Sequence, residues 1–279
     1  MTVLAAPAPR VRTWPGSRVN GWTLALGIYL IVFYAVLYGP LLMVVLLSFN
    51  DSEVTGFPLI GFTTKWYALV LSRPDLLAAL GNSFAVGIVA ASVATMLALL
   101  LSMAFRRVFS GQQIILGLVL LPIVLPGILG GIVLLIFFGY LGIRPGLYST
   151  VLVAHVNWVL PFAFLTLYPR LRGFDKALEE AAMDLGARRH QVLRLVVLPI
   201  IRPAVIATFL FSFSLSFDEF IRTVFVTGFD RTVPVVFWGA IVDRLAPELP
   251  AMAVIIIAVS TVGSLCGFAI SARARNRSH

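Results

Sequence analysis

The stretch EEAAMDLGARRHQVLRLVVLP, from Glu179 to Pro199, interrupts a chain that is otherwise mostly apolar. It holds three carboxylates, three arginines and one histidine. Residues 174–185 contain good helix formers, and their acidic side chains are concentrated in the first half. Gly186 follows, where the C-terminal end of a helix favours a residue with positive φ. Residues 188–197 then predict a second, basic and amphipathic helix, which we expect to end at Pro199.

The first of these two helices carries a small apolar face made by Ala181, Ala182 and Leu185. A flat alanine surface flanked by carboxylates suits insertion into a groove of a cytosolic partner. Two short helices separated by one glycine also make a compact, rigid unit. The stretch therefore predicts a docking element.

The composition around this stretch is that of a membrane protein. Of the 279 residues, 60% are hydrophobic and only 12% are charged, whereas a soluble domain has about 25% charged residues. A membrane-spanning helix needs roughly 20 apolar residues, and the chain has six such runs. They lie at about 22–48, 83–105, 114–139, 148–168, 203–227 and 250–272. We therefore expect an all-α membrane protein with six transmembrane helices.

The lysines and arginines indicate the orientation, because they are enriched in cytoplasmic loops. With the N-terminus inside, 15 of the 21 fall on the cytoplasmic side. The predicted organisation is a cytoplasmic arm at 1–21, a single transmembrane domain at 22–272 and a cytoplasmic tail at 273–279. The docking element lies in a cytoplasmic loop at about 169–202, between the fourth and fifth predicted spans.

Other segments carry weaker signals. Residues 50–81 and 228–249 are expected outside the membrane and contain short amphipathic pieces, which suit either anchoring at the interface or docking of a partner. Gly127 and Gly131 form a small-xxx-small spacing in the third run, which favours close helix packing.

Several chemistries are absent from the sequence. It has no HExxH or GxSxG motif and no paired-cysteine spacing, so we expect neither a metal site nor a catalytic site. A nucleotide-binding P-loop needs Lys followed by Ser or Thr. The two lysines are followed by other residues, since Trp follows Lys65 and Ala follows Lys176. If ATP drives this protein, a separate subunit must bind it.

A family resemblance rests on the opening stretch. Glu180-Ala181-Ala182, then Gly186, Val196 and Leu198-Pro199, resemble the EAA loop of the permeases of ATP-binding-cassette (ABC) importers, which usually have Ile at the Val196 position. Asn82-Ser83, the SFDEF sequence ending at Phe220 and the downstream RTVPV extend the resemblance over roughly residues 60–270. Within the family, FSFSLSFDEFIRTVFVTG followed by RTVPVVFWGAI is most similar to the second permease subunit of spermidine/putrescine transporters. Sugar, thiamine and ferric-ion permeases share the EAA loop, and they remain alternatives.

The resemblance implies a type I importer subunit in the bacterial inner membrane, with both termini cytoplasmic. The EAA loop would be the coupling helix, and its residues Glu180, Ala181, Ala182, Asp184, Leu185, Gly186, Leu198 and Pro199 would dock on an ATPase subunit. This chain would bind no cofactor, and ATP and Mg would bind to the ATPase. The further implied partners are a second, homologous permease and an extracytoplasmic solute-binding protein, which would deliver a small solute such as a polyamine.

Carboxylates in the fifth predicted span support a cationic solute. Asp218 and Glu219 lie in the outer half of the membrane, where such groups are costly and usually face a water-filled path. Arg222 follows Asp218 by four residues and could neutralise it on the same helix face. Glu219 lacks a cation nearby in the sequence and is the stronger candidate to meet the solute. His155 and Asn157 in the fourth span could line the same path, although a satisfied interhelical hydrogen bond is the more common role of such residues.

A free-standing secondary transporter is the rival interpretation from another class. Such proteins often show inverted repeats with interrupted helices in corresponding positions, and the sequence has neither signal. A membrane enzyme is the third interpretation, and it lacks a recognisable catalytic constellation.

Overall fold

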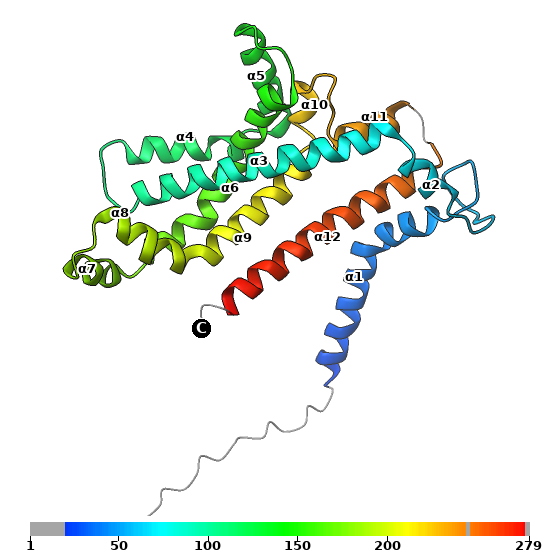
Figure 1. Ribbon diagram of the computed structural model, residues 1–279. Helices are drawn as coiled ribbons and strands as arrows, with labels where there is room; N and C mark the ends of the chain where they lie inside the picture. Colours follow the sequence, from blue (N-terminus) through cyan, green and yellow to red (C-terminus); the bar gives the residue numbers. More distant parts are fainter. Residues whose placement is uncertain (1–19, 244–245, 277–279) are drawn as a thin grey trace, which may run out of the picture. The chain divides into compact units, whose positions relative to one another are not determined.

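The computed structural model describes residues 20–243 and 246–276, and within them the chain is almost entirely helical (Figure 1). In this part of the chain the β contact is an isolated bridge between Asn50 and Phe62. The expectation of an all-α protein is therefore confirmed. The helices are α1 (Gly21–Leu47), α2 (Lys65–Leu71), α3 (Pro74–Ala104), α4 (Gln112–Val124), α5 (Gly127–Tyr140), α6 (Leu152–Arg172), α7 (Lys176–Asp184), α8 (Arg189–Val192), α9 (Leu198–Phe217), α10 (Thr223–Val226), α11 (Val233–Asp243) and α12 (Leu249–Asn276). Two π-helical turns, η1 (Leu147–Val151) and η2 (Leu193–Val197), precede α6 and α9. Most of the predicted arm at 1–21 and part of the tail at 273–279 lie outside the described residues.

The chain divides into two compact units, residues 1–46 and 47–279. The described part of the first unit is α1, which matches the predicted run at 22–48 and continues through Pro40. It contains no charged residue and is apolar on all sides, as a helix surrounded by lipid is.

Four helical segments are long and apolar enough to cross a membrane, namely Gly21–Leu47, Pro74–Ala104, Leu147–Arg172 and Arg189–Phe217. The bent pair α4–α5 is a fifth if it counts as one span. The sixth predicted run falls within α12, whose described apolar part, Leu249–Gly263, is shorter. The chain therefore has several spans, and the count of six stays a prediction.

Helices α3, α6 and α9 pack against one another and form the centre of the second unit (Figure 1). The buried face of α3 consists mostly of small residues. They are Ala79, Ser83, Gly87, Ala90, Ala91, Ala94, Thr95, Ala98 and Ser102. Small side chains let helix backbones approach closely, which drives helix association in membranes where the hydrophobic effect cannot. This composition explains why α3 takes the central position.

The third predicted span, at 114–139, is not one helix. It is broken into α4 and α5, which are bent by 110° from each other. Leu125 at the break is extended, with φ −74° and ψ 129°, because the ring of Pro126 disfavours the helical conformation of the residue before it. The expectation of one continuous span was wrong for this reason.

The fifth span also differs from the predicted 203–227. Helix α9 ends at Phe217, and after five intervening residues the short α10 begins at Thr223. Pro199 does not end the preceding helix, because α8, η2 and α9 follow one another without a break. In η2 the N–H of Leu198 bonds to Leu193 O, five residues back. This widened turn gives the proline ring room that a regular α-turn would deny it.

The two segments expected outside the membrane, 50–81 and 228–249, partly form the short helices that were predicted. Residues 65–71 and 233–243 form the short helices α2 and α11. The end of the predicted 50–81 segment instead belongs to α3, which begins at Pro74 with proline in the first turn, where its missing N–H costs nothing. Trp66 of α2 is buried and donates from Nε1 to Asn50 O at 2.9 Å.

The glycines of α5 form the close contact that their spacing predicted. A Cβ on Gly131 would lie 2.5 Å from Cδ2 of Phe225 in α10, and one on Gly127 would lie 3.2 Å from Cγ2 of Ile221. Both glycines therefore let the segment after α9 pack directly on the α5 backbone.

Gly131→Val should destabilise the protein by about 1–3 kcal/mol, because the added side chain has no room beside Phe225. Gly139→Val is the matched control in the same helix, since a Cβ at Gly139 meets nothing within 4 Å. Thermal unfolding of the purified protein in detergent measures the difference. Equal midpoints for the two variants would contradict the close contact.

Candidate functional site

The docking element begins with a capped helix. The side chain of Asp175 accepts a hydrogen bond from Ala177 N at 2.9 Å, so it satisfies one of the free N–H groups at the start of α7. Phe174, just before this cap, is buried among residues of α6 and α9. The start of the element is therefore fixed to the helix bundle.

The element turns at Gly186, as the sequence predicted. Its φ is +86°, which a β-branched residue rarely adopts. The N–H of Gly186 bonds to Met183 O at 2.9 Å, and the N–H of Ala187 bonds to Ala182 O at 3.0 Å. This pair of bonds is the Schellman motif, which satisfies the last carbonyls of a helix. A rigid turn therefore joins α7 to α8.

The predicted coupling residues lie on this turn and its two flanks. Glu180, Ala181, Asp184 and Leu185 are exposed, and Leu185 keeps 90% of its accessible surface. Ala182, by contrast, packs inward against the buried residues of α6 and α9. Leu198 is half-buried and Pro199 exposed, both at the start of α9.

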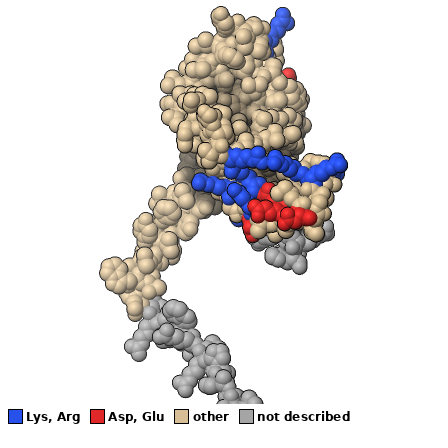
Figure 2. Space-filling model, turned by 90° about the vertical axis from the view of Figure 1, so that its left-hand side faces the viewer, with Lys and Arg blue, Asp and Glu red and all other residues tan. Residues whose placement is uncertain are grey.

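Charged side chains of both signs gather side by side at the end of the molecule that carries α7 and α8 (Figure 2). This end of the molecule therefore offers an exposed charged surface with apolar residues in it.

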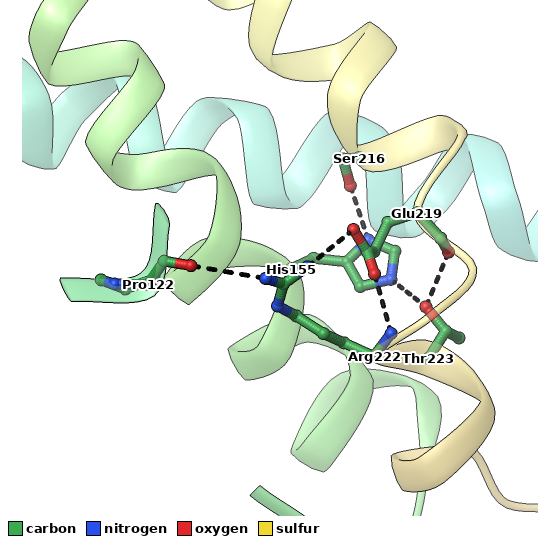
Figure 3. A network of polar contacts seen from close by, with 6 residues as sticks. All are labelled: Pro122, His155, Ser216, Glu219, Arg222 and Thr223. Atoms are coloured by element: carbon green, nitrogen blue, oxygen red, sulfur yellow. Dashed lines mark hydrogen bonds and ion pairs between the residues drawn. The ribbon is translucent and has the colours of Figure 1, made fainter. Parts of the chain in front are cut away.

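A second polar cluster surrounds the break between α9 and α10 (Figure 3). Glu219 and Arg222 form a buried ion pair, with Oε2 of Glu219 3.3 Å from Nη1 of Arg222. Oε1 of Glu219 also accepts from the backbone N–H of Arg222 at 2.8 Å. One carboxylate therefore neutralises a cation and satisfies a backbone donor at the start of α10, where helices leave N–H groups free.

The expected roles of the two carboxylates were therefore wrong in one respect. The sequence left open a pairing of Arg222 with Asp218, four residues away on one helix face, and indicated that Glu219 lacks a cation nearby. Because α9 ends at Phe217, Asp218 and Arg222 do not share a helix face. Arg222 pairs with Glu219 instead.

Arg222 also joins three separate parts of the chain. Its Nη2 donates to Pro122 O at 3.4 Å, a carbonyl that lost its usual helical partner because residue 126 is a proline without an N–H. Its guanidinium lies 3.9 Å from the ring centroid of Trp158 in α6, a cation–π contact. One side chain therefore connects the break after α4, the break after α9 and the middle of α6.

His155 bridges the α9–α10 break from α6. Its Nδ1 lies 2.7 Å from Ser216 Oγ, and its Nε2 lies 2.8 Å from Thr223 Oγ1. Because Thr223 Oγ1 donates to Glu219 O at 2.8 Å, its hydroxyl hydrogen is already used. In a neutral imidazole, Nε2 therefore donates to Thr223 and Nδ1 accepts from Ser216. Of its two possible roles, lining the solute path or making interhelical hydrogen bonds, His155 makes the hydrogen bonds.

Two of the predicted path residues remain accessible. Asp218 and Asn157 are exposed, and the Asp218 carboxylate lies beside the hydroxyl of Ser260 in α12. Among residues 20–243 and 246–276, no ion pair involves Asp218. The accessible negative charge of this segment is therefore on Asp218 rather than on Glu219.

The sequence did not indicate Trp158, Ser216, Thr223 or the carbonyl of Pro122 as parts of this cluster. Their partners lie 61 to 100 residues away along the chain, so no local pattern reports them. Within the described residues, no three His, Cys, Asp or Glu side chains come together as metal ligands would.

A bundle of apolar spans with an exposed two-helix element between α6 and α9 defines a membrane protein of the permease class. The chain belongs to the family described as "Binding-protein-dependent transport system inner membrane component", which matches residues 94–277. Its relatives include the spermidine/putrescine transport system permease protein PotC of Escherichia coli strain K12, 37% identical over 85% of this chain and 89% of the relative. The putrescine transport system permease protein PotI of the same strain is 31% identical over 90% of this chain and 92% of the relative.

The fold is similar to that of a chain in a solved bacterial ABC transporter involved in the import of the acidic polysaccharide alginate. The TM-score is 0.72 at 16% identity, over 90% of this chain and 96% of that chain. At this identity the similarity concerns the fold alone.

Removing one member of the buried pair should be far more damaging than removing both. Glu219→Gln or Arg222→Met alone leaves a buried charge uncompensated, which costs about 3–5 kcal/mol. The double variant should recover part of this loss. Thermal unfolding of the purified protein measures all three.

Lys65→Met is the control for that experiment, because Lys65 pairs with Asp51 on the surface and an exposed pair contributes only about 0–1 kcal/mol. If the double variant is as unstable as the sum of the two single variants, Glu219 and Arg222 do not act as a pair.

Proposed function

We propose that this chain is a membrane-spanning permease subunit of an ATP-driven ABC importer that carries a polyamine such as spermidine or putrescine. The observation that carries the proposal is the similarity to two polyamine permeases, at 37% and 31% identity over most of both chains. Permeases for sugars, thiamine or ferric ion share the family's loop, so they are the alternatives that an uptake measurement must separate. Family membership disfavours a free-standing secondary transporter.

The proposed arrangement has six spans, a single transmembrane domain at 22–272 and both termini in the cytoplasm. The lysine and arginine distribution supports this orientation, because 15 of the 21 then lie inside. The arm at 1–21, the tail at 273–279 and the loop at 169–202 would face the cytoplasm. The opposite face would receive a solute-binding protein, and a second, homologous permease would complete the pathway.

The α7–Gly186–α8 element is the proposed docking site for an ATPase subunit. ATP and Mg would bind to that subunit and not to this chain. Its exposed residues include the carboxylates of Glu180 and Asp184 and the highly exposed side chain of Leu185. The two hydrogen bonds of the Schellman turn restrict the motion of α7 relative to α8. A displacement of α7 by the ATPase subunit would therefore also displace α8.

Gly186→Val should detach the ATPase subunits and abolish uptake while the permease still inserts, because valine opposes the φ of +86°. Gly142→Val is the matched control. Gly142 also has a positive φ, of +67°, and a Cβ there meets nothing within 4 Å, so it imposes similar backbone strain in the turn after α5. Co-purification of the ATPase with the tagged permease measures the effect. Loss of the ATPase in both variants would mean that strain alone causes it.

The proposed solute path includes Asp218, Glu219, Asn157 and His155, in different roles. Asp218 and Asn157 are accessible and could contact the solute directly. Glu219 and His155 are buried and bonded to neighbours, so they would hold the shape of the path. A fixed carboxylate at Asp218 would offset part of the cost of dehydrating an ammonium group, and a neutral sugar would gain nothing from it.

Asp218→Asn keeps the shape of the side chain and should lower spermidine uptake by about tenfold, the effect of losing one charged hydrogen bond. Glu53→Gln, in the exposed segment before α2, is a control that removes the same charge. Uptake of radiolabelled spermidine into proteoliposomes that hold the complete complex measures both variants. Unchanged uptake in Asp218→Asn would remove this residue from the path, and absent uptake in the wild type would refute the polyamine assignment.

A further inference from the structure

Helix α7 has limited packing contacts with the helix bundle. It packs against α8 and η2, which directly follow it in the chain. Its half-buried Ala182 reaches the apolar cluster of α6 and α9, whereas most of its other side chains are exposed. A force on α7 therefore passes readily along the chain into α9, but α3, the central helix, needs a separate connection.

One contact makes that connection. Arg106, just after the end of α3, donates from Nη2 to Oε1 of Glu179 in α7, 73 residues further along the chain. The two side chains keep only 14% and 22% of their accessible surface. The guanidinium of Arg106 also lies over the ring of Phe174, 5.7 Å from its centroid. The pair is partly shielded from water, so its charges attract more strongly than those of an exposed pair.

A cavity lies beside this contact. A cavity of about 690 Å³ lies between the end of α3, α7 and α8, and Met103, Arg106, Glu179, Met183 and His190 are among its lining residues. Because this cavity lies between α7 and the end of α3, the ion pair is a direct link between these two helices. The acidic and basic side chains of this end lie side by side in Figure 2.

The positions of Glu179 and Arg106 at helix ends stabilise both α7 and α3. Glu179 lies in the first turn of α7, and Arg106 follows the last turn of α3. A negative charge near a helix N-terminus and a positive charge near a C-terminus each interact favourably with the helix dipole. The pair therefore stabilises the two ends that it connects.

We propose that Arg106 and Glu179 form a strut that carries a displacement of α7 directly to α3, and through α3 to α6 and α9. The strut rests on the proposed role of α7 as the ATPase dock. Arg106 is a positioning residue in this scheme, since it contacts neither solute nor nucleotide. Without the strut, α7 would still bind the ATPase, but its movement would reach the bundle through η2 and α9 alone.

Charge reversal tests the strut with a matched control. Arg106→Glu and Glu179→Arg each place two like charges across the cavity, and the double variant restores an ion pair with its polarity reversed. Arg107→Glu makes the same charge change at the exposed neighbouring residue. In proteoliposomes holding the complete complex, we measure spermidine taken up per ATP hydrolysed, together with co-purification of the ATPase.

Each single reversal should lower this ratio by about fivefold, as expected for loss of a charge-assisted hydrogen bond, while the ATPase still co-purifies. The double variant should recover to near the wild-type ratio, and Arg107→Glu should match the wild type. If a reversed variant fails to insert, Arg106→Gln and Glu179→Gln test the same loss without repulsion. A double variant as impaired as the single ones, or an Arg106→Glu ratio equal to that of Arg107→Glu, would overturn the strut.

A distance measurement separates failure of the strut from failure of the proposed solute. Spin labels at the exposed Leu178 of α7 and Leu100 of α3, in a Cys266→Ser background, report their separation without any solute. In the wild type this separation should stay constant when a non-hydrolysable ATP analogue is bound, because the helices move together. In Arg106→Gln it should change. Equal behaviour of the two proteins would refute the strut even if spermidine is transported.

Discussion

The second unit depends on one constraint of the membrane interior, where each backbone N–H and C=O group must find a partner within the protein. Two spans of this chain are broken, at Leu125–Pro126 and between Phe217 and Thr223. Each break frees backbone groups, and side chains from the second break satisfy groups at both of them. Arg222 donates to the carbonyl that Pro126 leaves without a partner, and Glu219 accepts from the N–H of Arg222. His155 then bridges the residues on both sides of the second break. Arg222 therefore links the two interruptions.

The three charged side chains that follow α9 therefore have two different roles. Glu219 and Arg222 neutralise each other in the interior, so their charges are structural. Asp218 belongs to no ion pair among the described side chains and is exposed. In the proposed path, a solute with positive charge would meet the carboxylate of Asp218, while the Glu219–Arg222 pair beside it carries no net charge. The glycines of α5 allow this scaffold to form, because a side chain at Gly131 would collide with Phe225.

The α7–Gly186–α8 element follows a different principle, since it is held mainly by local interactions. The Asp175 cap, the positive φ of Gly186 and the two Schellman bonds all join residues close together in the chain. Its long-range contact is the bond from Arg106 to Glu179. A local element with few tertiary contacts can move as a unit, and the strut gives that movement a route to α3.

Local chemistry explains what could be predicted from the sequence. Apolar runs, the basic loops, the glycine turn and the small-xxx-small spacing each depend on neighbouring residues, and they predicted the helical class, the family and the α7–Gly186–α8 element. The breaks were missed because an apolar run looks the same whether its helix is continuous or bent. The pairing of Glu219 with Arg222 was missed because it depends on where α9 ends. Whether Asp218 or Glu219 keeps its charge accessible was decided only by the tertiary structure. Glu219 pairs with Arg222, whose other contacts are Pro122 of α4 and Trp158 of α6, and no local pattern specifies which distant segments will meet.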